Sequence, residues 1–250
     1  FTATFPQAVT VDSTGGTPSI AIDVGGEPKE ATYVSGSGDT DLVFQYEVET
    51  DDEDTNGITI TAPEISLNGG TMTDGNGDVV LSFVMPSTAG VLVDAVAPTV
   101  VGSPTGPIAG SYGNGDDLDI TVVMSEAVTV DETGGTPTIP LTIGGQIRNA
   151  DYVSGSGTTT LVFRYTITSP TDVYANDTIG VGDIDLAGGT ITIQDTAGND
   201  ADLTGYVAPT PTGVLINRTE PTVAVTTPAV PATSVAGDII EFTATYAQAV

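Results

Sequence analysis

Oxygen ligands at alternating positions mark one stretch of this sequence as a candidate cation site. Asp74, Asn76 and Asp78 form a D-x-N-x-D triplet with glycine at the two intervening positions. Carboxylate and amide oxygens are the ligands that Ca²⁺ prefers, and glycine lets the backbone curl around an ion. No glutamate follows at the twelfth position to complete an EF-hand, and an Asn-Gly pair is equally typical of a hairpin turn. The triplet therefore predicts either a Ca²⁺ site or a polar turn.

A second group of acidic residues flanks a linker that contains a proline. Asp94 precedes Pro98, and the following segment contains Asp116, Asp117 and Asp119. Like charges that lie close together repel each other unless a cation screens them. We expect a Ca²⁺ ion at this joint, where coordination would replace repulsion and stiffen the linker. The alternative is an acidic surface that only keeps the chain soluble.

The densest acidic run is the segment 51–54, Asp-Asp-Glu-Asp. The equivalent segment later in the chain keeps only Asp172. A cation site common to both places is therefore not expected, and we interpret 51–54 as a solvated loop.

The residue types that are missing exclude most other chemistry. The 250 residues include 33 Asp and Glu against 4 Lys and Arg, a formal net charge of −29, and no His, Cys or Trp. Disulfides, thiol nucleophiles and Ser-His triads are excluded, and no pattern places two carboxylates in one pocket for glycoside hydrolysis. We expect no enzymatic activity. Nucleic acids and anionic membranes need Lys and Arg on their partner, and no apolar stretch could span a bilayer, so neither partner is expected.

These residues sit in an internal repeat with a period of about 120 residues. The segment 8–20 (AVTVDSTGGTPSI) recurs as 127–139 (AVTVDETGGTPTI). The segment 33–46 (YVSGSGDTDLVFQY) recurs as 152–165 (YVSGSGTTTLVFRY), and 242–250 (FTATYAQAV) returns to 1–9 (FTATFPQAV). Such a period is that of an ordinary domain rather than of a solenoid unit.

Two prolines mark the predicted domain starts. Pro98 and Pro221 each follow a predicted last strand, and proline interrupts strand pairing. We predict one complete domain at 98–220, a domain at 1–97 that lacks its first strand or strands, and the first strands of a third domain at 221–250. The two incomplete parts either come from a longer array or complete each other between neighbouring chains.

Alternating apolar residues predict strands throughout. Leu42, Phe44, Tyr46 and Val48 alternate with more polar residues, and the second copy repeats the aromatic face. Turn signals such as SGSG and TGGTP separate the strands, and no useful stretch has helical periodicity. The sequence predicts an all-β fold of tandem immunoglobulin-like β-sandwich domains. Tyr33 and Tyr152, which precede the SGSG turns, are predicted to be packing residues.

The series V-x-x-S-E-A-V-T-V, TGGTP, Y-V-S-G-S-G, L-V-F-x-Y and D-x-A-G-N carries a resemblance that covers the whole chain. It resembles the tandem immunoglobulin-like repeats of giant bacterial cell-surface proteins. These include the extender repeats of RTX-type adhesins and the surface repeats of gliding or swimming cyanobacteria. The resemblance implies export, stiffening by Ca²⁺, and a role in adhesion or spacing.

Three functions follow as expectations. The first is a non-catalytic extender of a long extracellular or cell-surface protein, with adhesion to a surface glycan, a host or a biofilm left to regions outside this sequence. The second is a subunit of a self-assembling extracellular filament or sheath, joined by strand complementation between copies of the chain. The third is a carbohydrate- or receptor-binding module, which the absence of Trp makes less favoured.

Overall fold

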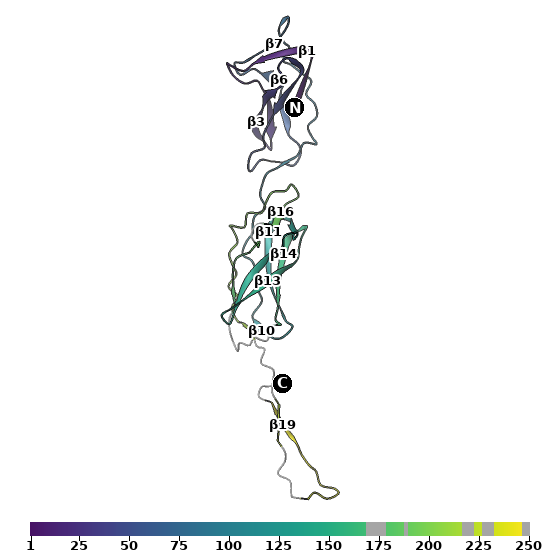
Figure 1. Ribbon diagram of the computed structural model, residues 1–250, viewed down its shortest axis with the longest axis vertical. Helices are drawn as coiled ribbons and strands as arrows, with labels where there is room; N and C mark the ends of the chain where they lie inside the picture. Colours follow the sequence, from purple (N-terminus) through teal and green to yellow (C-terminus); the bar gives the residue numbers. More distant parts are fainter. Residues whose placement is uncertain (169–178, 188–189, 217–222, 227–232, 247–250) are drawn as a thin grey trace. The chain divides into compact units, whose positions relative to one another are not determined.

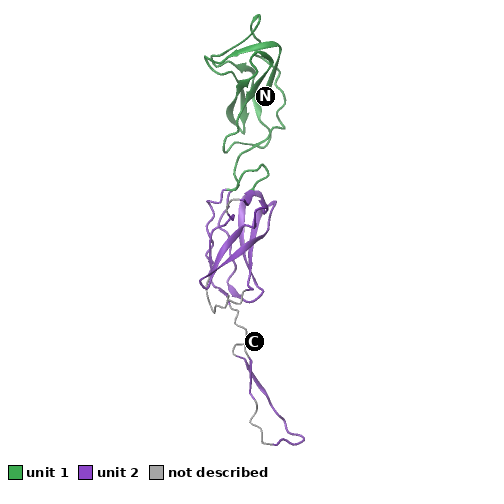
Figure 2. Cartoon of the chain, in the orientation of Figure 1, with its two compact units in different colours: residues 1–98, 194–201 green, residues 99–193, 202–250 purple. Residues whose placement is uncertain are grey.

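The computed structural model describes residues 1–168, 179–187, 190–216, 223–226 and 233–246 (Figure 1). The chain divides into two compact units (Figure 2). Unit 1 comprises Phe1–Pro98 with Gln194–Ala201, and unit 2 comprises Thr99–Ile193 with Asp202–Val250. All regular secondary structure of the described residues is β-strand, which confirms the all-β prediction. These residues include no helix that could cross a membrane. Pro221 and Asp172 lie outside the described residues.

Unit 1 is built on one curled antiparallel sheet. Its strands are β1 (Thr2–Asp12), β2 (Ser19–Val24), β3 (Glu27–Ser35), β4 (Asp39–Gln45), β6 (Thr59–Ser66), β7 (Thr71–Asp74) and β8 (Gly77–Asp78). Their order in the sheet is β6-β2-β3-β4-β1-β7-β8. Two short strands, β5 (Glu53–Asp54) and β9 (Val93–Asp94), pair separately. A curled sheet that encloses an apolar core fits a β-sandwich.

Unit 2 contains a sheet of the same kind. Its strands are β11 (Asp117–Asp131), β12 (Thr138–Ile143), β13 (Gln146–Ser154), β14 (Thr158–Thr166), β15 (Ile179–Val181) and β16 (Thr192–Gln194). Their order is β15-β12-β13-β14-β11-β16. Strand β10 (Gly110–Tyr112) pairs in parallel with β17 (Val214–Ile216), and β18 (Val223–Thr226) pairs with β19 (Thr243–Tyr246).

The two sheets agree in strand order and in register. Thr2 lies opposite Val43 in unit 1, and Thr121 lies opposite Val162 in unit 2, an offset of 119 on both strands. The long strands β1 and β11 both change register at the same place, between Thr4 and Val9 and between Val123 and Val128. The sequence repeat is thus matched by the same backbone pairing in both units.

Alternation along β4 and β14 places the large apolar side chains in the core. Leu42 and Phe44 are buried, as are Leu161 and Phe163. The predicted alternation extends too far in unit 1, because β4 ends at Gln45 and Val48 is 49% exposed. The chain leaves the sheet there, so the last apolar position of the pattern is not drawn into the core.

The tyrosines before the two SGSG turns pack as predicted. Tyr33 meets Phe44 edge to face with ring centroids 5.9 Å apart, and Tyr152 meets Phe163 at the same separation. Each hydroxyl also accepts a hydrogen bond from the turn that follows, from the Ser37 N–H at 2.8 Å and from the Ser156 N–H at 2.6 Å. Each tyrosine therefore joins the core to the turn between two strands.

Candidate functional site

The predicted triplet forms a hairpin between β7 and β8. Asp74 lies opposite Gly77, and the Asp74 carboxylate accepts a hydrogen bond of 2.6 Å from the Asn76 N–H. The Asn76 amide reaches the Gln7 side chain at 3.5 Å, and Asp78 is exposed on β8. The polar-turn alternative accounts for this geometry without an ion, while Ca²⁺ binding by the triplet stays a prediction.

The aspartates that follow the first linker are held at the start of β11. The Arg164 guanidinium donates two hydrogen bonds of 2.7 Å to the Asp119 carboxylate and lies 3.0 Å from that of Asp117. The Thr166 hydroxyl donates to Asp117 as well, and Asp116 accepts the Gly113 N–H at 2.7 Å. A positive charge already faces Asp117 and Asp119, so the repulsion that suggested a cation there is relieved by the protein itself.

Sequence reasoning missed Arg164 because its partner Asp119 lies 45 residues away. The signal that could have found it is the antiparallel pairing of the two predicted strands. In that pairing Asp119 lies directly opposite Arg164. The equivalent position in the first copy is Gln45, which carries no charge.

Asp94 has a different environment, which also involves Asp195 and Asn199 of the D-x-A-G-N motif. The Asn199 side-chain amide donates to the Asp94 carbonyl oxygen at 3.1 Å and to a carboxylate oxygen of Asp195 at 2.7 Å. A carboxylate oxygen of Asp94 and one of Asp195 lie within 4.8 Å of each other. Unit 1 thus brings two carboxylates and a carbonyl oxygen together around the Asn199 amide nitrogen, and carboxylate and carbonyl oxygens suit Ca²⁺.

Asp195 is fixed in this arrangement by its own loop. Its side chain is buried, and one carboxylate oxygen accepts the N–H groups of Gly198 at 2.7 Å and of Asn199 at 2.9 Å. Burial raises the pKa of Asp195, but the hydrogen bonds from Asn199 and Gly198 outweigh it and hold the pKa below its ordinary value. Asp195 is therefore a preformed anion that faces the neighbouring Asp94.

The acidic run 51–54 differs from the solvated loop that was expected. Asp52 and Asp54 are both buried. The Asp52 carboxylate lies 2.9 Å from the Lys29 ammonium and accepts hydrogen bonds from the Tyr46 hydroxyl and the Glu49 N–H. Asp54 accepts hydrogen bonds from two glycine N–H groups, at 2.9 and 2.8 Å. The expectation was wrong for these two side chains because local N–H groups and a distant lysine satisfy them.

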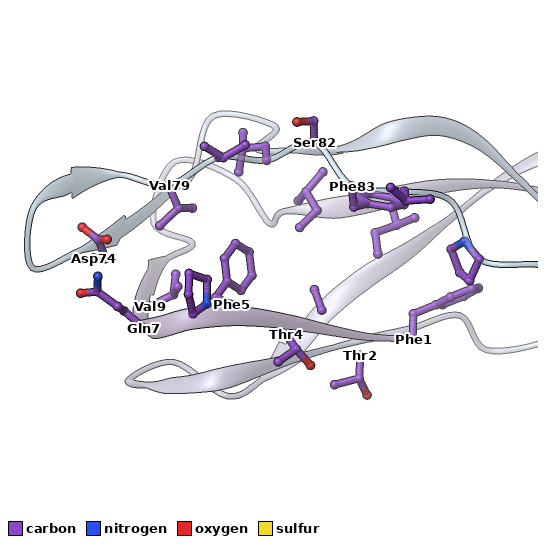
Figure 3. A pocket seen from close by; sticks show the side chains of 18 of the residues that line it. Phe1, Thr2, Thr4, Phe5, Gln7, Val9, Asp74, Val79, Ser82 and Phe83 are labelled. Carbon is purple, nitrogen blue, oxygen red and sulfur yellow. The ribbon is translucent and has the colours of Figure 1, made fainter.

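An apolar groove of about 800 Å³ lies along β1 in unit 1. One wall is the first half of β1, from Phe1 to Gln7, and the other is the segment 78–84 with Pro86. Figure 3 shows Phe5 pointing from β1 into the groove and Phe83 pointing in from the opposite wall, while Thr2 and Thr4 point away from it. This groove borders the part of unit 1 where the sequence predicted a first strand to be lacking.

Comparison with protein-family models, with curated proteins and with solved structures finds no match to this chain. The acidic site around Asp94 and Asp195 and the repeated sheet are therefore the features that bear on function.

Proposed function

We propose that the chain is a non-catalytic structural segment of a long bacterial cell-surface or secreted protein. In this proposal, tandem immunoglobulin-like β-sandwich domains separate or display regions that serve adhesion. The observation that carries it is the shared strand order and register of the two sheets, which repeat along the chain with an offset of 119. Repeated domains of one design extend the length of a chain.

The charge of the chain supports an extracellular, solvent-exposed location. The net charge of −29 keeps neighbouring molecules apart and opposes aggregation of strand edges. The chain has no cysteine, so its domains fold in the same way in a reducing and an oxidising compartment.

The acidic site of unit 1 is the place where Ca²⁺ would act in this function. Asp94 and Asp195 would supply carboxylate oxygens, and the Asp94 carbonyl and the Asn199 amide lie beside them. The site joins strand β9 to the loop 195–199, which is about 100 residues further along the chain. A bound ion would replace repulsion between the two carboxylates by attraction to both and would stabilise the folded chain.

Thermal unfolding of the whole chain tests this proposal. We expect the melting temperature to rise with CaCl₂ and to fall back with EGTA, while MgCl₂ at equal concentration gives only the smaller rise that ionic screening produces. At a concentration about 100 times the dissociation constant, the stabilisation is about 2.7 kcal/mol. Asp94→Asn should abolish the response, and Asp41→Asn at an exposed position of β4 is the matched control that should keep it. An unchanged melting temperature in wild type would refute Ca²⁺ binding here.

A further inference from the structure

Four asparagines in this chain precede a glycine, namely Asn56, Asn68, Asn76 and Asn114. In such a pair the backbone nitrogen of the glycine can react with the carbonyl carbon of the asparagine side chain. Glycine has no Cβ to hinder this close approach. The reaction requires an asparagine side chain that is able to rotate and a glycine nitrogen that is able to reach it. The structure meets these two requirements to different degrees at the four pairs.

Hydrogen bonds fix the side chain of Asn68. Its amide nitrogen donates to the Thr17 carbonyl oxygen at 3.0 Å and to the Ser19 hydroxyl at 2.9 Å. Its side-chain oxygen accepts a hydrogen bond of 2.7 Å from the Ser66 hydroxyl. The Asn68 side chain therefore has to break three hydrogen bonds before it turns toward the glycine that follows.

In two other pairs the glycine nitrogen is itself engaged. Gly57 is buried, and its N–H donates a hydrogen bond of 2.8 Å to the Asp54 carboxylate. The Gly115 N–H donates a hydrogen bond of 2.8 Å to the Ile167 carbonyl oxygen, which joins the residues just before β11 to those just after β14. Each nitrogen would have to give up its hydrogen bond before it could react.

The pair Asn76-Gly77 is the least constrained of the four. Asn76 is exposed at the turn between β7 and β8, and its side-chain amide makes a long, weak contact of 3.5 Å with the Gln7 side chain. Gly77 is exposed as well, and a Cβ built there would have open space around it. Gly77 pairs with Asp74 in β8, a strand of two residues at the edge of the sheet. So short an edge strand opens locally at little cost, which releases the Gly77 nitrogen.

We propose that Asn76 is a site of spontaneous deamidation in the folded chain, with Gly77 supplying the attacking nitrogen. This nitrogen loses its proton and bonds to the Asn76 Cγ, while the bond from Cγ to Nδ2 breaks and ammonia leaves. The succinimide ring that results takes up one water molecule. Opening of the ring at Cγ leaves aspartate, and opening at the backbone carbonyl carbon leaves isoaspartate. This inference goes beyond the proposed structural function and does not rest on it.

Both products change the hairpin between β7 and β8. Each adds a negative charge beside the carboxylates of Asp74 and Asp78, and like charges this close repel one another. Isoaspartate also inserts its Cβ into the backbone, so the turn becomes longer. Short hairpin loops accept only a few backbone conformations, and the pairing of Asp74 with Gly77 depends on the present one. We therefore expect β8 to separate from β7 in the isoaspartate form.

The test compares the folded chain with the same chain in urea, both incubated at mildly alkaline pH, where the attacking nitrogen loses its proton more readily. Peptide mapping by mass spectrometry locates the aspartate and isoaspartate that form. We expect the folded chain to react several-fold faster at Asn76 than at Asn56, Asn68 or Asn114. In urea the four pairs should react at similar rates, because unfolding removes the hydrogen bonds that distinguish them.

Variants identify the reacting residue. Asn76→Gln should remove the fast reaction of the folded chain, because the longer side chain would have to close a larger ring. Asn114→Gln is the matched control at another exposed asparagine, and it should leave the fast reaction unchanged. Hydrogen exchange of β7 in Asn76→Asp and in the isolated isoaspartate form separates the effect of charge from that of the longer backbone.

The outcomes that overturn the proposal are equally definite. One is a folded chain that reacts at Asn56, Asn68 or Asn114 as fast as at Asn76. Another is a folded chain that does not react at Asn76 under conditions in which the chain in urea reacts at all four pairs. A fast reaction that survives in Asn76→Gln would likewise assign it to a different residue.

Discussion

The hydroxyl groups of Tyr33 and Tyr152 perform the same task in two places. Each ring packs on a buried phenylalanine, and each oxygen accepts an N–H from the turn that follows. The ring and the oxygen therefore stabilise the structure separately, one by apolar packing and one by a hydrogen bond. A change that removes only the oxygen isolates the second contribution.

Tyr152→Phe should lower the free energy of unfolding by about 0.5–1.5 kcal/mol, because the Ser156 N–H loses its acceptor while the ring stays packed. Tyr33→Phe should cost a similar amount through Ser37. Tyr112→Phe is the control, because that hydroxyl donates to the Ile108 carbonyl in an exposed loop. Urea denaturation measures the three changes. A loss for Tyr112→Phe as large as for the other two would contradict the assignment.

The pKa of Asp195 gives a prediction on pH. Hydrogen bonds hold the pKa below the ordinary value of 3.8, so the folded state keeps the carboxylate ionised to a lower pH than the unfolded state does. The stability that the ionised Asp195 carboxylate contributes is present above its ordinary pKa of 3.8. It is lost as the pH falls through the lower pKa of the folded state.

The test is the difference in free energy of unfolding between wild type and Asp195→Asn, measured in EGTA across pH. We expect a constant advantage for wild type from about pH 7 to about pH 5 that shrinks below about pH 4. Taking the difference cancels the effect of the other carboxylates. An advantage that grows on acidification would show that the folded pKa is raised instead.

At the scale of elements, two equivalent turns set the path of the strand that follows them. One turn joins β3 to β4, and the other joins β13 to β14. Gly155 has φ of 118°, and a Cβ there would lie 2.0 Å from the Thr160 carbonyl oxygen. Gly36 shows the same approach to Asp41. The turn therefore requires glycine for two reasons, the left-handed backbone and the close passage of the next strand.

Gly155→Ala should destabilise unit 2 by about 1–3 kcal/mol from the backbone conformation, and by more from the clash with β14. Gly157→Ala is a matched control, since Gly157 also has a positive φ but has open space around it. The difference between the two variants in urea denaturation measures the close approach alone. Equal losses would mean that the strand moves aside without cost.

At the scale of the whole molecule, the charge is the dominant property. A net charge of −29 on 250 residues opposes both the compact state and the approach of a second copy. Partly buried ion pairs such as that of Lys29 with Asp52 neutralise only a small part of this charge. Salt screens such repulsion over a distance that falls from about 30 Å at 0.01 M to about 10 Å at 0.1 M.

We therefore expect NaCl over that range to raise the melting temperature. Screening requires only ionic strength, whereas a specific Ca²⁺ site requires the ion itself. Comparison of NaCl with CaCl₂ at equal ionic strength separates the two effects in calorimetry. A melting temperature that does not respond to NaCl would show that repulsion has little influence on folding.

Local sequence patterns predicted much of the fold and little of the acidic chemistry. Alternation of Leu42 with Phe44, and the repeated SGSG turn, depend on neighbouring residues and were confirmed by the burial and the strand pairing. The contact of Asn199 with Asp94 joins residues that are 105 positions apart, and no local pattern indicates it. The same holds for Asp52, whose burial depends on Lys29 of another strand. A run of acidic residues in the sequence shows where negative charge is concentrated. It does not show which of the carboxylates are buried.

Pro6 has a consequence for backbone pairing along the edge of β1 that does not face β4. An uninterrupted strand edge would form a long series of backbone hydrogen bonds with any extended peptide, whatever its side chains. Pro6 replaces the position that Ser125 fills in unit 2, where the Ser125 N–H donates to the Thr99 carbonyl oxygen. A strand beside this edge therefore forms few backbone hydrogen bonds, and its affinity depends on side chains that fit beside Phe5. The missing donor thus protects this edge against non-specific strand pairing.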